Sequence, residues 1–217
     1  MATSFVNTSS DSGSFVYSVN PAVPAGVQDG DLLIAFVGGA AIDTSASGWT
    51  YLGGISEFRG FFKIANLESG TYTFNQVVQS GLRAQVVAYR GGFDTADPID
   101  ANSSAVYGYN DSTLKGGTVS PTLFQDETLI FFGGCYRTSA VTFSAPTSPI
   151  TFTEDVDTGD TTGDMWCIFA HGTWYVDGTS GDIDSTMSVS TPNKQAFVLA
   201  LNPKVNVSNP ILASMGF

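Results

Sequence analysis

A single histidine, His171, limits the catalytic chemistry that this chain of 217 residues can offer. A nucleophile–base pair would need this imidazole as its base, beside an activated Ser or Cys. Cys135 and Cys167 lie in the apolar runs FFGGCYR and DMWCIFA, which contain no nucleophile elbow and no Cys–His signature. Both are expected to be buried free thiols, with one disulfide between them as the alternative. We therefore expect His171 to be a hydrogen-bonded strand residue, and the protein to be non-enzymatic with no catalytic residues.

Metal and phosphate chemistry have little support in the residue types. One histidine and two separated cysteines do not supply a tetrahedral zinc site, and no glycine-rich segment carries a P-loop lysine. Carboxylates gather in EDVDTGDTTGD (154–164) and VDGTSGDID (176–184), where a calcium loop or a glycan-cleaving carboxylate pair would have to lie. The glycine in DVDTGD is misplaced for an EF-hand, so we expect solvated acidic turns, no metal and no cofactor.

The overall charge excludes two classes of partner. The formal net charge is −12 and the isoelectric point is about 4.1. Such a surface repels nucleic-acid phosphates and anionic membranes, so neither is expected as a partner. The opening MATSFVNTSS has no basic region and no long apolar run follows it, which predicts neither a signal peptide nor a membrane span.

Aromatic side chains are the residues of this sequence that could bind a sugar, provided that their rings are exposed. Trp49 follows the turn SASG, and Tyr107 and Tyr109 share one face of VYGYN if that stretch is extended. These three residues are the candidates for ligand binding, with a host-surface glycan as the candidate ligand. The alternative is that the rings fill the core of a β-protein, as most buried aromatic side chains do.

The elements that must position these residues are strands. About eleven short apolar or alternating runs are separated by turn signals such as PAG, QDGD, LESG and YRGG, and no window keeps a helical period. With 24 glycines and only 13% charged residues, the composition also favours strands joined by turns. The fold class is therefore all-β, an antiparallel β-sandwich of jelly-roll type.

The two halves of the chain resemble each other. GDLLIAFVGG (30–39) is matched by DETLIFFGGC (126–135), and LRAQVVAYRG (82–91) by NKQAFVLALNP (193–203). A lone half would expose its apolar face, so we predict one sandwich domain over residues 1–204, with pseudo-repeated halves at about 1–100 and 118–204. Residues 205–217 would form a C-terminal arm.

The strands at 31–37, 84–90, 128–132 and 196–201 are apolar on both faces. An antiparallel sheet usually has one dry and one wet face. Two explanations stay open: the outer faces lie under loops of the same chain, or they pack on a neighbouring subunit as obligate interfaces do.

The chain ends are the candidate assembly contacts. The tail KVNVSNPILASMGF has two nearby prolines and would be an exposed sticky segment if nothing covered it. The N-terminal ATSFVNTSSDSGSF is expected to be too polar to hold itself in place. The predicted contacts are Phe5, Ile211, Leu212, Met215 and Phe217.

Residues 20–100 resemble a β-sandwich module of bacteriophage virion proteins, of the head decoration (cement) or tail-associated type. The resemblance is carried by PAGVQDGDLLIAFV (24–37), SGWT (47–50), FFKIA (61–65), YTF (72–74), VVAYRG (86–91) and DPID (97–100). Its motifs are structural and transfer no active-site residues. The second half matches only through the repeated strand pattern.

The resemblance implies a particle protein made in the host cytoplasm and placed on the outer capsid surface. The expected function is a capsid decoration protein that stabilises the head by bridging capsid subunits. Its expected partners are the major capsid protein and copies of itself, in a homo-oligomer expected to be a trimer. The alternative is a tail-associated receptor- or carbohydrate-binding module.

Overall fold

The computed structural model describes residues 2–55, 57–103, 110–121, 127–175 and 179–204. No helix occurs among these residues, and so none there is long and apolar enough to cross a membrane. They form thirteen strands, which confirms the all-β expectation. The strands are β1 Ser4–Val19, β2 Leu32–Gly38, β3 Thr50–Ile55, β4 Phe58–Ile64, β5 Phe74–Arg90, β6 Ile99–Asn102, β7 Asp111–Lys115, β8 Glu127–Tyr136, β9 Phe143–Ser144, β10 Thr153–Asp160, β11 Met165–Trp174, β12 Asp184–Thr191 and β13 Lys194–Leu201.

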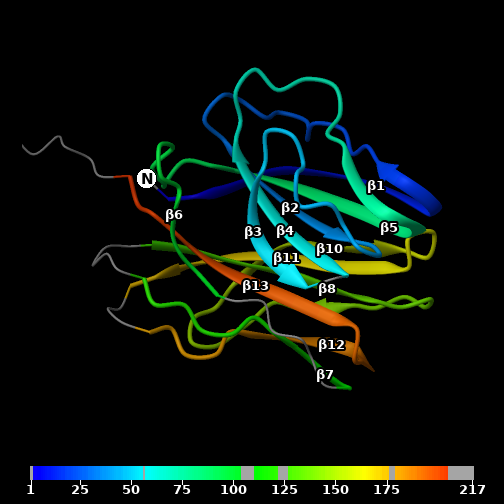
Figure 1. Ribbon diagram of the computed structural model, residues 1–217. Helices are drawn as coiled ribbons and strands as arrows, with labels where there is room; N and C mark the ends of the chain where they lie inside the picture. The colour runs from blue at the N-terminus through cyan, green and yellow to red at the C-terminus, as the bar shows by residue number, and fades with distance from the viewer. Residues whose placement is uncertain (1, 56, 104–109, 122–126, 176–178, 205–217) are drawn as a thin grey trace, which may run out of the picture.

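The strands build three antiparallel sheets that lie in layers (Figure 1). Sheet I has the order β1-β5-β2-β4-β3, and sheet II has the order β10-β11-β8-β13-β6. Sheet III is the small sheet β7-β12-β9. Sheet II lies in the middle, so the molecule is a sandwich with a third layer added to one side.

The main core lies between sheets I and II. Phe36 of β2 stacks on Phe58 at 5.5 Å, and Phe132 of β8 stacks on Phe197 at 4.9 Å. The Phe36 and Phe132 rings meet edge to face at 6.2 Å, which locks the two sheets together. These residues belong to a cluster of sixteen buried side chains drawn from both large sheets.

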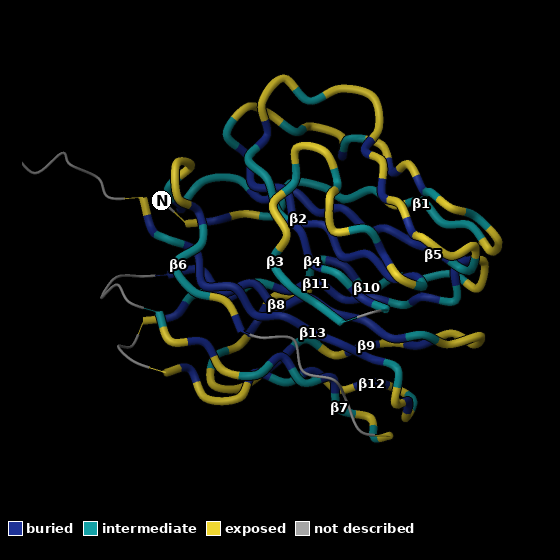
Figure 2. Tube along the Cα trace, in the orientation of Figure 1, coloured by how far each residue is buried: buried dark blue, intermediate teal, exposed yellow. Residues whose placement is uncertain are grey.

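The outer faces of both large sheets are covered by the same chain. Sheet III covers sheet II, where Leu114 and Met187 pack against Phe131 and Ile168. The segments 20–31, 40–49 and 65–73 cover sheet I and contribute Ile42, among others. This explains why β2 and β13 are buried on both faces, as Figure 2 shows by their dark blue colour. A neighbouring subunit is not needed for that burial.

Two expectations about local structure were wrong. The polar N-terminal segment forms β1, which pairs with β5 from Ser4↔Arg90 to Val19↔Phe74 through several bulges. Backbone hydrogen bonds of the ladder fix it, and its side chains Phe5, Val6 and Val16 pack against the adjoining cores. Residues 156–160 of the acidic stretch belong to strand β10 rather than to a turn, because they pair with β11, whereas 161–164 form the expected turn.

Candidate functional site

A β-bulge in β10 builds a polar cluster at the edge of the main core. Glu154 pairs with Ala170 and Val156 pairs with Phe169, so Asp155 is the extra residue between them. Bulges re-aim the side chain of the inserted residue and recur beside functional sites. Here the bulge directs Asp155 toward β5 and β11 at the edge of the inter-sheet core.

Asp155 accepts hydrogen bonds from two rings that belong to different sheets. His171 Nδ1 of β11 lies 2.9 Å from both carboxylate oxygens, and the Tyr89 hydroxyl of β5 donates to Oδ2 at 2.8 Å. The two rings meet edge to face with centroids 5.9 Å apart. Burial, and then the neighbouring Asp155 charge, raise the pKa of Tyr89 well above its usual value, so the phenol stays a donor. The hydrogen-bonded role expected for His171 is confirmed.

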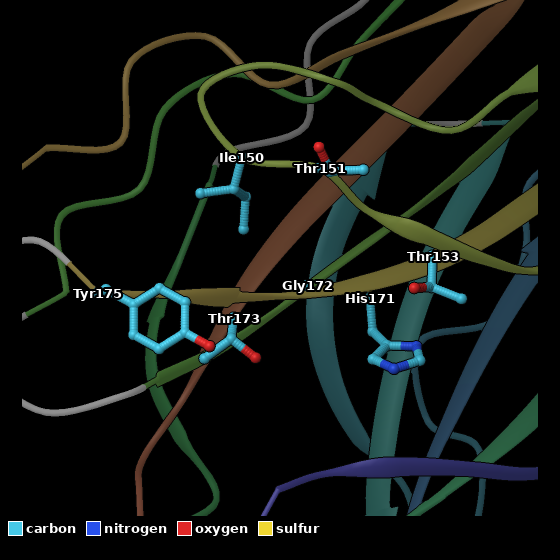
Figure 3. A pocket seen from close by; sticks show the side chains of 7 residues that line it. All are labelled: Ile150, Thr151, Thr153, His171, Gly172, Thr173 and Tyr175. Atoms are coloured by element: carbon cyan, nitrogen blue, oxygen red, sulfur yellow. The ribbon is translucent and has the colours of Figure 1, made fainter.

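A hollow of about 440 Å³ opens beside His171 (Figure 3). The side chains of His171, Thr173 and Tyr175 project from the same side of β11 and its continuation. Gly172 lies between them; a Cβ there would come within 2.9 Å of Ile150 Cδ1, so the glycine lets the neighbouring segment close one wall. The hollow is lined by Ile150, Thr151, Thr153, His171, Gly172, Thr173 and Tyr175.

The chemistry available in this hollow is that of hydrogen bonding. Three threonine hydroxyls and the imidazole line it, and its lining includes no cysteine, serine or carboxylate side chain. Cys135 and Cys167 are free and buried, as expected. Burial raises the pKa of each thiol to about 12, so both are protonated at neutral pH and are poor nucleophiles.

A second candidate region is apolar and lies at the far end of the β1–β5 pair. Phe15 and Tyr17 of β1 and Val77 and Val78 of β5 are each more than half exposed. We call these four residues the ribbon end. The Gln79 side-chain amide donates to the Phe15 carbonyl at 2.8 Å and ties the two strands together there. Figure 2 shows this end of β1 and β5 in yellow, away from the dark blue core.

The ribbon end contains four of the seven large apolar side chains that are exposed in the described part of the chain. Large apolar side chains left exposed at one end of a strand pair are candidates for an interaction site. The sequence did not single it out, because Phe15 and Tyr17 belong to SFVYSV (14–19), a run typical of an ordinary strand. The bulge that joins Asp155 to His171 likewise has no sequence signal.

The aromatic and assembly residues predicted from the sequence do not come together in one described site. Trp49 is half-buried in the cover of sheet I, where it packs edge to face on Tyr72 at 5.1 Å. Phe5 is partly buried and packs on Tyr89 at 6.3 Å, so the main core already accounts for its burial. Tyr107, Tyr109, Ile211, Leu212, Met215 and Phe217 lie outside the described residues.

The acidic residues do not gather around a common point within the described ranges, where no group of three His, Cys, Asp or Glu side chains could hold a metal ion. The carboxylates of β10 point to separate partners instead. Asp157, for example, accepts from the Phe143 backbone N–H at 3.0 Å. Comparisons with protein-family models, with curated proteins and with solved structures gave no match.

Proposed function

We propose that the protein is a non-enzymatic structural protein of a bacteriophage particle, which decorates the outside of the head and bridges capsid subunits. The single observation that carries the proposal is the ribbon end. The chain covers the outer faces of both its large sheets by itself, yet leaves four large apolar side chains exposed at one end of the β1–β5 pair. A partner surface that covers them would gain the free energy of burying that area.

The occupant that we propose for the ribbon end is the major capsid protein. Decoration places many copies on one shell, so each contact need be only modest in area, because the contacts act together through multivalency. The resemblance of residues 20–100 to phage virion modules supports this choice of partner. The acidic surface supports it as well, since a high net charge keeps particles dispersed.

A duplicated architecture is part of the proposal. The strands expected to correspond are β2 with β8, β5 with β13 and β4 with β11. The neighbour orders β5-β2-β4 and β13-β8-β11 are the same, which supports two halves of common design. The jelly-roll connectivity stays a prediction. In the described strands, sheet I draws only on residues 4–90 and sheet II only on residues 99–201.

The test of the head contact uses binding to particles. Heads prepared without the protein would be mixed with the wild-type chain or with the double variant Phe15→Ser/Tyr17→Ser, and sedimented. We expect the wild type to sediment with heads and to raise their melting temperature, and the double variant to bind at least tenfold more weakly.

Leu67→Ser is the matched control, because Leu67 is 82% exposed and lies outside the ribbon end. It should bind as the wild type does. The proposal is wrong if the wild type does not bind heads, or if the double variant binds as well as the Leu67 control.

We also propose that the protein self-associates through Ile211, Leu212, Met215 and Phe217, as expected from the sequence. This is tested separately by the mass in solution of the full chain and of a chain that ends at Lys204. That truncation keeps the bridge between Phe93 and Pro203 and the bond from Lys204 N–H to Gly92 O. We expect an oligomer for the full chain and a monomer for the truncation. Two monomers would contradict the part of the proposal that assigns Ile211, Leu212, Met215 and Phe217 to assembly.

A further inference from the structure

The hollow beside His171 plays no part in the proposed contact with the head. It lies on β11 and the segment before β10, and neither its lining nor its supports include a residue of the ribbon end. Its volume of about 440 Å³ is within the usual range for small-molecule sites. An inference about it therefore stands or falls independently of head binding.

The imidazole at the hollow is held in one orientation. A carboxylate can only accept hydrogen bonds, so the ring must donate Nδ1–H to Asp155, whose side chain is 3% exposed. In the neutral ring this leaves Nε2 as an acceptor. The described residues offer Nε2 no protein donor, and the ring stays 19% exposed on the side of the hollow.

The lining has the two features that recognise a polyhydroxylated ring. Thr151, Thr153 and Thr173 each bring a hydroxyl that can donate and accept, and His171 Nε2 adds an acceptor for a ligand hydroxyl. Tyr175 is 71% exposed and lines the hollow together with the apolar Ile150 (Figure 3), so its ring is open to a ligand. An aromatic face packs well on the C–H face of a sugar while hydroxyls around it are hydrogen-bonded.

The charges near the hollow select against an anionic ligand. Asp155 supports the site from within, and Glu154 and Asp157 lie on the same strand beside it. Neither Lys nor Arg is among the lining residues. A carboxylate, sulfate or phosphate on the ligand would meet these negative charges without a cation to pair with.

We propose that the hollow lined by Thr153, His171, Thr173 and Tyr175 binds a neutral carbohydrate. His171 accepts a hydrogen bond from a sugar hydroxyl through Nε2, and Tyr175 packs on the sugar ring. Asp155 is a positioning residue, because it sets the imidazole tautomer without facing the ligand. The site differs from the one predicted at Trp49, Tyr107 and Tyr109.

The test begins with the purified full chain on an array of neutral, sialylated and sulfated oligosaccharides. The neutral oligosaccharide that binds best is then titrated by calorimetry. We expect binding to neutral members of the array, and at least a tenfold loss of affinity in Tyr175→Ala and in Thr173→Val. Both changes alter partly or largely exposed side chains, so the fold should persist and can be checked by circular dichroism.

Tyr17→Ala is the matched control, since it removes another exposed tyrosine that does not line the hollow. It should leave carbohydrate affinity unchanged while weakening head binding, so that the two proposals fail separately. The carbohydrate site is refuted if no neutral oligosaccharide binds, if only anionic ones bind, or if Tyr175→Ala and Tyr17→Ala bind equally well.

Discussion

Two carboxylates of β10 join sheet II to sheet I through β5, and they do so in different ways. Asp155 accepts from Tyr89 and His171, and His171 lines an open hollow. Asp160 instead forms an ion pair with Arg83, whose side chain is 3% exposed, and the turn at 161–164 folds back over the pair. An acidic residue between sheets is therefore not itself a sign of function; the adjoining hollow is what distinguishes Asp155.

The two contacts also differ in charge. Arg83 is buried and permanently cationic, and its second amino group donates to Gln85 Oε1 at 3.1 Å. Asp160 further accepts from the Ser12 hydroxyl at 2.7 Å and from the Gly163 N–H at 2.9 Å. The Asp155 contact joins a carboxylate to a phenol and an imidazole, neither of which must be charged. The Asp160–Arg83 pair should thus contribute more to the free energy of unfolding than the Asp155 contact does.

The largest effect is expected from Asp160→Asn, which leaves the buried Arg83 guanidinium without its counter-charge. Removing one partner of a buried pair costs about 3–5 kcal/mol, and because the Asp160 side chain is 36% exposed we expect roughly 2 kcal/mol. Urea unfolding measures the change in the free energy of unfolding. A loss below about 0.5 kcal/mol, the size of an ordinary surface change, would remove the distinction between the two contacts.

Asp155→Asn should cost less, roughly 1 kcal/mol, because the amide oxygen can still accept one of the two hydrogen bonds. Tyr89→Phe is the matched change on the other side of the contact and should cost about the same. Urea unfolding of both variants beside Asp160→Asn gives the order directly. If Asp155→Asn were the most damaging of the three, the stability argument would be reversed.

A smaller effect is expected at acidic pH. Burial acts to raise the pKa of Asp160, but the Gly163 N–H, the Ser12 hydroxyl and Arg83 outweigh it and lower that pKa overall. A lowered folded-state pKa gives stability that is present above the unfolded value of about 3.9 and is lost as pH falls through the folded pKa. Asp160→Asn should therefore flatten the loss of stability below about pH 4, measured by urea unfolding across pH.

Asp157→Asn is the contrasting control for this pH series. Burial raises the pKa of Asp157, so its contribution has the opposite sign and falls as pH rises through the folded pKa. Removing the Asp157 carboxylate should therefore leave the loss of stability below about pH 4 as steep as in the wild type. Equal acid profiles for the two variants would show that the Asp160 pair is not the source of the effect.

The smallest effect is a change in which ring nitrogen of His171 carries the proton. We do not expect it to be visible in the free energy of unfolding. Because His171 is the only histidine, a tag-free sample has one pair of imidazole ¹⁵N signals. We expect the neutral ring to carry its proton on Nδ1, toward Asp155, and Asp155→Asn to shift the population toward the other tautomer. A wild-type ring protonated on Nε2 would contradict the acceptor role assigned to that atom.

The fold class could be predicted from the sequence because alternation and turn residues are local signals. The runs at 31–37 and 196–201 became β2 and β13 as expected. What covers them could not be predicted, since the loops around Ile42 and the strands of sheet III lie far away in the chain. The strand expected at SFVYSV (14–19) is the last part of β1, but the polar part at 4–13 was missed, because it is ordered by pairing with β5, which no local pattern reports.

The candidate site was predictable only in part. His171 was correctly expected to be a hydrogen-bonded strand residue, but its partner depends on a one-residue bulge at Asp155. Tyr89 lies within an apolar strand, VVAYRG, where nothing in the sequence separates it from a core residue. Trp49 stood out as a ring after a turn, and the same position lets it pack over sheet I.

The pairing of β1 with β5 has a consequence for synthesis on the ribosome. Ser4 meets Arg90, which lies 86 positions later, so the first strand emerges long before its partner exists. At about 5–20 residues per second, that delay is roughly 4 to 17 seconds. An apolar strand waiting that long would be liable to pair with other nascent chains. The run NTSSDSGS (7–14) in the middle of β1 is polar, so this part of the strand offers little apolar surface for such pairing while it waits.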